Sequence, residues 1–250
     1  MPYGICHLSV IPVRAQADNS SEMLTQLLYG EHFRITENRK FWSKVRIVDD
    51  GTEGWITKQQ FLQLDKPQFD TIQQNKSPEY ASDLVGYASG KDQVLIPVLL
   101  GSSVSNAPLM DQSFEGACLN GTGSKSNIVP TAMYYLHAPF LWGGKTPFGV
   151  DDAGLSQMVY KINGNQIPRR ASEQAMVGES LSFIEESEPG DLAFFDDKEG
   201  NIDHVGIIMK DNFIIHSHGK VRIDRLDHTG IFNREEGRYS HSLRVIKRIV

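Results

Sequence analysis

The sequence predicts an α+β protein in which an all-β N-terminal part precedes a core of one helix and antiparallel strands. Residues 1–64 contain short apolar or alternating runs separated by polar turns, as in a small β-barrel. Residues 127–250 contain helical periodicity followed by several apolar strands that tight turns connect. At 250 residues, the chain is long enough for one large domain or for two to three small ones.

The composition is that of an ordinary globular protein. Hydrophobic residues make up 40% of the chain, charged residues make up 22%, and the net charge is -6. Lysine and arginine are scattered, so we expect no nucleic-acid partner. No apolar run reaches the roughly 18 residues of a membrane span, and no signal peptide is recognised at the N-terminus. We therefore expect the chain as given to be cytoplasmic, or periplasmic or exported if an export signal has been removed.

The two cysteines, Cys6 and Cys118, lie far apart in the sequence. Neither is close to a turn of a catalytic type, and their spacing matches no zinc motif. We expect both to be buried free thiols, and a disulfide between them is the alternative.

The first 64 residues are predicted to form a small barrel. The expected strands are Ile5–Val13, His32–Thr36, Trp42–Val48 and Gly54–Ile56. Turn residues such as Asp49-Asp50-Gly51 separate them. The arginine after the first strand, the Gln-Leu-Leu-x-Gly-Glu turn and the final Gly-Trp resemble a bacterial SH3-like domain.

Residues 65–125 carry a weaker signal. Tyr80, Leu84 and Tyr87 recur at helical spacing, which predicts a short helix over Ser77–Ser89, and the apolar run Val94–Leu100 predicts a strand. The Gly/Ser-rich stretch 121–127 is the best linker in the chain. We interpret residues 65–125 as a second, degenerate SH3-like domain.

The C-terminal half begins with two predicted helices. The first, Asn127–His137, turns Ile128, Ala132, Tyr135 and Leu136 inward. The second starts beside Asp152, after a glycine-rich turn, because Leu155, Met158 and Val159 follow at helical spacing. The expected strands that follow are Leu192–Phe195, Val205–Met209, Phe213–Ile215 and Leu243–Ile249.

An ordered series of motifs covers this half. The motifs are WGG at 142–144, GVD at 149–151, GLSQ at 154–157, PR at 168–169, PGDL at 189–192, DHVGI at 203–207 and IIHS at 214–217. Together they resemble the NlpC-type family of bacterial cell-wall peptidases, which implies a papain-like core with a helix packed on an antiparallel sheet. Two SH3-like barrels ahead of such a core resemble the γ-D-glutamyl-L-diamino acid endopeptidase subgroup. The expected domains are residues 1–64, 65–125 and 126–250.

The resemblance implies a triad of nucleophile, base and orienting residue. His204 and His216 match the base and the orienting residue. Asp152, however, stands where the family has its nucleophilic cysteine. Attack by a carboxylate on an amide would give a mixed anhydride, which is more reactive than the amide, so we expect papain-type hydrolysis to be absent.

Five other positions belong to the substrate site that the resemblance implies. Phe140 replaces a tyrosine, Ala153 replaces a serine, and Arg170 replaces an aspartate that helps to bind the amine of the substrate. Glu22 matches a glutamate that also faces this amine, although Thr52 replaces a tyrosine of the same domain. Trp142, together with Phe148, is expected in the pocket wall and core.

Several interpretations of the site stay open. One interpretation is that Asp152 is a helix cap, worth about 1 kcal/mol over alanine, and a salt bridge to protonated His204 is compatible with that role. Asp151 is expected to contact substrate or backbone. A metal site of Asp152, His204 and His216 is disfavoured because the family geometry does not make the three converge, so we expect no metal and no cofactor. His218, His228 and His241 are expected to be solvated.

The sequence therefore predicts a catalytically inactive homologue of a γ-D-glutamyl-L-diamino acid endopeptidase, retained as a binding or scaffold protein. Its expected partner is a peptidoglycan-derived peptide or another protein. The alternative is an active cell-wall peptide hydrolase in which Asp152 acts differently, for example as a general base on water together with His204.

Overall fold

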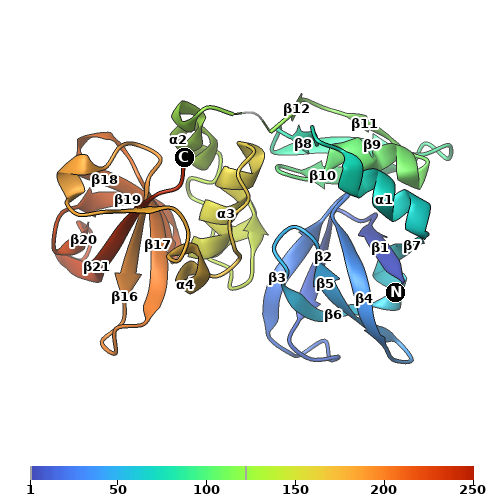
Figure 1. Ribbon diagram of the computed structural model, residues 1–250, viewed down its shortest axis with the longest axis horizontal. Coiled ribbons are helices and arrows are strands. Elements are labelled where there is room, and N and C mark those ends of the chain that lie inside the picture. Colours follow the sequence, from blue (N-terminus) through green and yellow to red (C-terminus); the bar gives the residue numbers. More distant parts are fainter. Residues whose placement is uncertain (1, 122) are drawn as a thin grey trace. The chain divides into compact units, whose positions relative to one another are not determined.

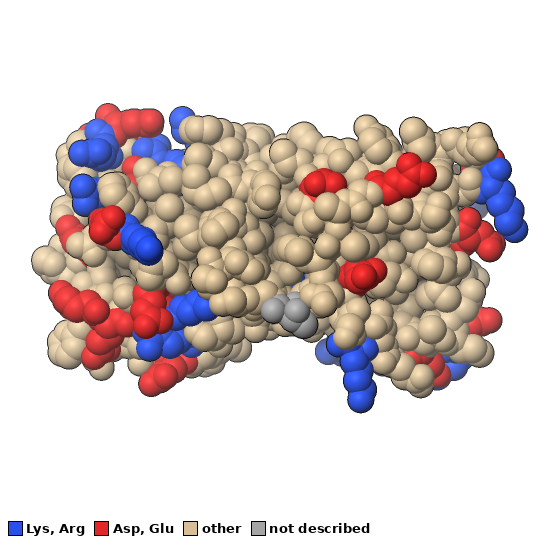
Figure 2. Space-filling model, turned by 90° about the horizontal axis from the view of Figure 1, so that it is seen from above, with Lys and Arg blue, Asp and Glu red and all other residues tan. Residues whose placement is uncertain are grey.

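The computed structural model describes residues 2–121 and 123–250. The chain forms two compact units, Met1–Thr122 and Gly123–Val250, and each is built mainly from β-strands (Figure 1). On the face drawn in Figure 2, acidic and basic side chains are intermixed at the left, whereas several acidic side chains toward the right stand apart from basic ones. Among the described residues, none of the helices has the length and apolar character needed to cross a membrane.

A seven-stranded antiparallel sheet dominates the first unit, with the order β3-β2-β6-β5-β4-β1-β7. Its strands are β1 (Tyr3–Cys6), β2 (Val10–Arg14), β3 (Met23–Leu28), β4 (His32–Asn38), β5 (Trp42–Ile47), β6 (Glu53–Thr57) and β7 (Phe61–Leu64). Inward residues such as Val13, Phe33 and Val45 are fully buried in one cluster. The predicted strands are therefore present, although the first run divides into β1 and β2.

The rest of this unit is α1 (Lys66–Gln74), β8 (Tyr80–Ala81), β9 (Val85–Ser89), β10 (Leu95–Leu99), η2 (Val104–Met110), β11 (Ser113–Glu115) and β12 (Cys118–Leu119). The predicted helix over Ser77–Ser89 is wrong, because β8 and β9 occupy this segment. In β9 the buried positions are Gly86 and Ala88, whereas Tyr87 is exposed. Small residues with a period of two form the buried face, so the apparent helical spacing of larger residues was misleading.

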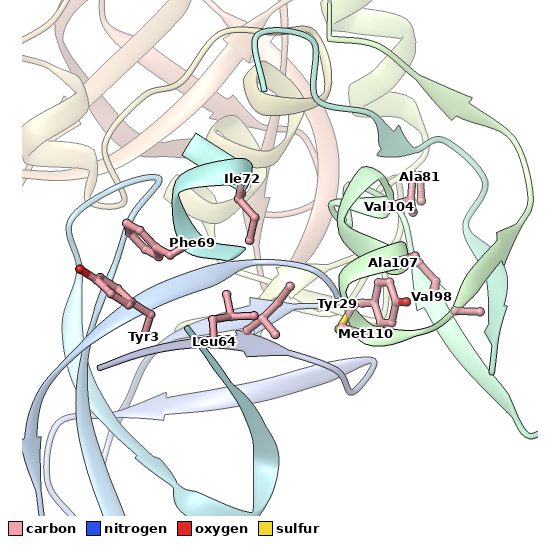
Figure 3. Packing of buried hydrophobic residues seen from close by; sticks show 12 residues of the cluster. Tyr3, Tyr29, Leu64, Phe69, Ile72, Ala81, Val98, Val104, Ala107 and Met110 are labelled. Atoms are coloured by element: carbon pink, nitrogen blue, oxygen red, sulfur yellow. The ribbon is translucent and has the colours of Figure 1, made fainter. Parts of the chain in front are cut away.

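One hydrophobic cluster joins the seven-stranded sheet to the segment that follows it (Figure 3). Phe69 of α1 stacks on Tyr3 of β1 with ring centroids 4.0 Å apart. Tyr29 and Leu64 belong to the same cluster as Val104 of η2. The two parts of the unit therefore share a core, and a domain boundary at residue 64 stays a prediction.

The cysteines differ in their surroundings. Cys6 and Cys118 are both free thiols, as predicted, but only Cys6 is buried. The expectation that Cys118 is buried is wrong, since it lies in the two-stranded pairing of β12 with β8.

The second unit combines a closed barrel with helices. The barrel strands are β16 (Leu192–Asp196), β17 (Ile202–Ile208), β18 (Phe213–His218), β19 (Lys220–Leu226), β20 (Gly230–Asn233) and β21 (Arg238–Arg248). Closure results from β20, which pairs with both β19 and β21. The strand β15 (Glu179–Leu181) extends the sheet at β21. Of these strands, β15, β19 and β20 were not predicted from the sequence.

The remaining elements of this unit are η3 (Lys125–Asn127), α2 (Ile128–Met133), β13 (Lys145–Thr146), β14 (Gly149–Val150), α3 (Asp152–Ile162), α4 (Ala171–Gln174), η4 (Ile184–Glu186) and η5 (Lys210–Asn212). The α-helix predicted over Asn127–His137 is shorter than expected, since α2 ends at Met133. Helix α3 packs against β17 and β18, and all of its residues are buried. Leu155, Met158 and Val159 are inside, as their spacing predicted.

Candidate active site

The start of α3 is held by Asp151. Its backbone is extended, and its Oδ1 accepts a hydrogen bond from the Gly154 amide at 2.6 Å, which satisfies a free N–H of the first helical turn. Its Oδ2 accepts from the Gly143 amide at 2.8 Å. Arg169 binds both carboxylate oxygens, at 2.9 and 2.6 Å. Asp151 therefore fixes the glycine-rich turn, the helix and the Pro-Arg segment together.

Asp152 is the first residue within α3, so the interpretation of Asp152 as the helix cap is wrong: the cap is Asp151. Its side chain points instead toward β17, where Oδ2 accepts from the Val205 amide at 3.1 Å and lies 3.2 Å from Nδ1 of His204. Only 7% of the residue is exposed. The structure therefore contains the predicted contact between Asp152 and His204.

Burial by itself raises the pKa of Asp152. The hydrogen bond and the charge of His204, together with the amides of Ala153 and Val205, outweigh burial and leave the pKa below its ordinary value. The carboxylate is therefore ionised at neutral pH.

A line of hydrogen bonds continues from Asp152 across three strands. Nε2 of His204 in β17 lies 2.8 Å from Nδ1 of His216 in β18. Nε2 of His216 lies 3.1 Å from Oδ2 of Asp224 in β19. The register supports this line, because Gly206 pairs with His216 across β17 and β18, which places His204 and His216 on one face of the sheet.

Arg222 anchors the far end of the line. Its Nε donates to Oδ2 of Asp224 at 2.6 Å, and its guanidinium also binds Asn233 and Glu235. Burial raises the pKa of Asp224, but the hydrogen bonds of His216 and Arg222 outweigh this and lower it to about 2. Asp224 therefore stays ionised although it is buried.

The hydrogen bonds also fix how many protons the two histidines carry. Three bonds connect Asp152, His204, His216 and Asp224, so three protons are needed, whereas two neutral imidazoles carry two. Burial lowers the pKa of His216 to about 4. His216 is therefore neutral at pH 7.

Comparison with known proteins places the residues of this site within a known domain family. The NlpC/P60 family pattern matches residues 137–236, which include the start of α3 and both histidines. The chain therefore contains an NlpC/P60 domain in its second unit. A bacterial dipeptidyl-peptidase SH3 domain matches residues 13–61. The fold class predicted from the sequence is thereby confirmed.

Two curated relatives of this chain carry the name γ-D-glutamyl-L-lysine dipeptidyl-peptidase. The protein from Bacillus subtilis is 27% identical over 77% of this chain and 71% of its own length. The protein from Bacillus cereus is 24% identical over 80% of this chain and 68% of its own length.

Solved structures show the same fold. An NlpC/P60 family protein from Bacillus cereus covers 99% of both chains with a TM-score of 0.79 at 18% identity. An NlpC/P60 endopeptidase from Photobacterium damselae covers 97% of this chain and 70% of its own, with a TM-score of 0.68 at 15% identity.

His241 lies in this NlpC/P60 site, and the expectation that it is solvated is wrong. The residue is half-buried in β21, and its ring stacks on His204 with centroids 4.0 Å apart at 19°. Burial and the neighbouring histidines lower the pKa of His241 to about 2, so the ring is neutral. No local motif marks His241, because only the pairing of β21 with β16 and β20 brings it to the site. His218 and His228 are exposed, as predicted.

The predicted substrate residues lie in different places. Ala153 is buried in α3, and Arg170 is exposed directly before α4. Phe140 is exposed, and Trp142 and Phe148 are 59% and 61% exposed, so the expectation that the latter two are core residues is wrong. Glu22 is exposed in the other unit, directly before β3. Their roles toward a substrate stay predictions.

Proposed function

We propose that this protein is a catalytically inactive homologue of γ-D-glutamyl-L-diamino acid endopeptidases that binds a peptidoglycan-derived peptide or a protein partner. One observation carries the proposal: the residue at the family's nucleophile position is the carboxylate of Asp152, ion-paired with His204 at 3.2 Å. The names of the two curated relatives support the substrate class.

The chemistry of the pair supports inactivity. In a Cys–His pair the histidine takes the thiol proton and creates the nucleophile. The Asp152 carboxylate carries no such proton, and it already accepts hydrogen bonds from His204 and from the Val205 amide. Any acyl group that it accepted would be a mixed anhydride, which is more reactive than the amide, so the released amine would attack it and return the amide.

A second candidate is an active hydrolase in which Asp152 and His204 act together on water. Their contact is the arrangement that general-base catalysis would use. Against it, the lowered pKa of Asp152 makes the carboxylate a weak base at neutral pH. The buried position also gives water little access to the carboxylate.

Turnover separates the two candidates. The purified protein is incubated with L-Ala-γ-D-Glu-L-Lys, and the release of free lysine is followed. We expect the same rate as in a blank, and the same result for His204→Ala. A rate above the blank that His204→Ala abolishes would show an active enzyme and would end the proposal of inactivity.

Binding is measured separately by thermal unfolding with the same tripeptide. A ligand that binds only the folded state at about 100 times its Kd adds about 2.7 kcal/mol to the free energy of unfolding. A rise in Tm would support a peptide-binding role. No rise in Tm would favour a protein partner or a scaffold.

We propose the cytoplasm as the compartment of the chain as given. Cell fractionation with an antibody against the protein would test this.

A further inference from the structure

Three histidine rings from three strands of the barrel converge beside α3. One ring nitrogen of each of His204, His216 and His241 lies within 4.8 Å of the corresponding nitrogens of the other two. We propose that these three histidines bind a divalent transition metal ion, with zinc as the ion that suits three imidazoles and an open fourth position best. This site goes beyond the proposed function, because it requires neither peptide binding nor inactivity.

The hydrogen bonds select the ligand atoms of two rings. Nδ1 of His204 faces Asp152, which leaves Nε2 for a metal. Nε2 of His216 faces Asp224, which leaves Nδ1. These two remaining nitrogens already point at one another, 2.8 Å apart. Tetrahedral ligands at a Zn–N distance of about 2.05 Å lie about 3.3 Å apart, so a shift of about 0.5 Å would admit the ion.

Both rings have a carboxylate on their outer nitrogen. A histidine that binds zinc almost always donates its other N–H to a carboxylate, a carbonyl or water, which fixes the tautomer and makes the ligand nitrogen more basic. The carboxylates of Asp152 and Asp224 occupy these positions, 3.2 Å from Nδ1 of His204 and 3.1 Å from Nε2 of His216. Their two negative charges also offset the charge of the ion.

This arrangement differs from the set of Asp152, His204 and His216 that was considered from the sequence. Asp152 contacts the nitrogen of His204 that faces away from His216. It therefore supports a ligand and does not bind the ion itself. His241 takes the third position instead.

His241 completes the set from β21. Its Nδ1 lies 2.8 Å from the hydroxyl of Ser240, which leaves Nε2 for a metal. Its ring is stacked on that of His204 with centroids 4.0 Å apart, so His241 has to turn about its side-chain bonds to aim Nε2 at an ion that His204 holds. His204 and His216 are buried, whereas His241 is half-buried. The fourth coordination position of the ion would therefore face solvent on the side of His241. Metal binding replaces the proton between His204 and His216, and this proton leaves to solvent.

Zinc chloride is the probe, titrated into the chelator-treated full chain without peptide in competition with a chromophoric chelator. We expect one high-affinity zinc per chain. His241→Phe keeps an aromatic ring stacked on His204 but removes the nitrogen, and we expect its zinc affinity to fall at least about 10-fold. Asp224→Asn is expected to lower the affinity about 10- to 100-fold.

Two matched controls remove donors that lie outside the cluster. His228→Ala and Cys118→Ser each delete an exposed side chain, and both are expected to bind zinc like the original chain. Absence of a high-affinity zinc, or equal binding by His241→Phe, would overturn the proposal. X-ray absorption of the unmodified zinc protein tests it without a variant: three imidazole nitrogens at about 2.0–2.1 Å are expected, and sulfur ligation would contradict it.

Because the titration contains no peptide and measures no turnover, its outcome is independent of the tests of the proposed function. A protein that binds zinc at this cluster and still cleaves the tripeptide would refute inactivity alone. A protein that does neither would refute the metal site alone.

Discussion

Replacement of Asp152 by asparagine is predicted to cost much less stability than replacement by alanine. The Val205 amide and Nδ1 of His204 both contact Oδ2 of Asp152, so the asparagine has to turn about its last side-chain bond to accept from Val205 with its Oδ1 and to face His204 with its NH2 group. If His204 becomes neutral with its proton on Nε2, it accepts from the asparagine and still donates to His216. All three hydrogen bonds are then satisfied with two neutral imidazoles.

The magnitude follows from what each variant loses. Asp152→Asn loses the additional strength of a charged hydrogen bond, about 1–2 kcal/mol. Asp152→Ala leaves the Val205 amide and a buried histidine without an acceptor and opens a small cavity, so we expect about 3–5 kcal/mol.

Urea unfolding at pH 7 measures both free energies of unfolding, and nitrogen NMR shifts of His204 report its tautomer. Equal losses of stability in the two variants would refute the exchange of tautomers, as would a doubly protonated His204 in Asp152→Asn.

The stabilisation that Asp152 provides depends on pH with a defined sign. Since the pKa of Asp152 is lowered in the folded protein, its stabilisation is present above the unfolded value of about 3.9 and disappears as pH falls through the folded pKa. The gap between the original protein and Asp152→Asn is therefore expected to close in acid.

Two other predictions concern the same helix start. Asp152→Cys alone is not expected to release lysine from the tripeptide. The family resemblance predicts a hydroxyl at Ala153 and a carboxylate at Arg170, which the variant would still lack, and groups that act as a unit fail together. Cleavage by this single variant would contradict the reasoning. Asp151→Ala is expected to lower the free energy of unfolding by about 3–5 kcal/mol, because it removes the helix cap and leaves Arg169 as a buried charge. A loss below about 1 kcal/mol in urea unfolding would show that Asp151 does not join these segments.

Local patterns were sufficient for much of the second unit. The spacing of Leu155, Met158 and Val159 predicted α3, and the apolar runs predicted β16, β17 and β18. The sequence also indicated that Asp152, His204 and His216 belong to one site, because the motifs around them occur in the order of a known family. Periodicity and motif order are properties of short segments, so they can be recognised without a fold.

Local patterns failed where a distant segment or a backbone angle decided the outcome. Two adjacent aspartates precede α3, and only the extended backbone of Asp151 makes that residue the cap. Residues 77–89 showed helical spacing, but pairing with β10 and β11 makes β9 a strand.

The sequence by itself indicated the NlpC/P60 domain and the fold class, since both depend on which residues stand in a known order. The loss of the nucleophilic cysteine at Asp152 stays its prediction. Only the tertiary structure decided what surrounds Asp152. Barrel closure brings His241 from β21 onto His204, and β19 brings Asp224 behind His216. These contacts join residues that are distant in sequence, and their geometry depends on strand register, which no short segment specifies.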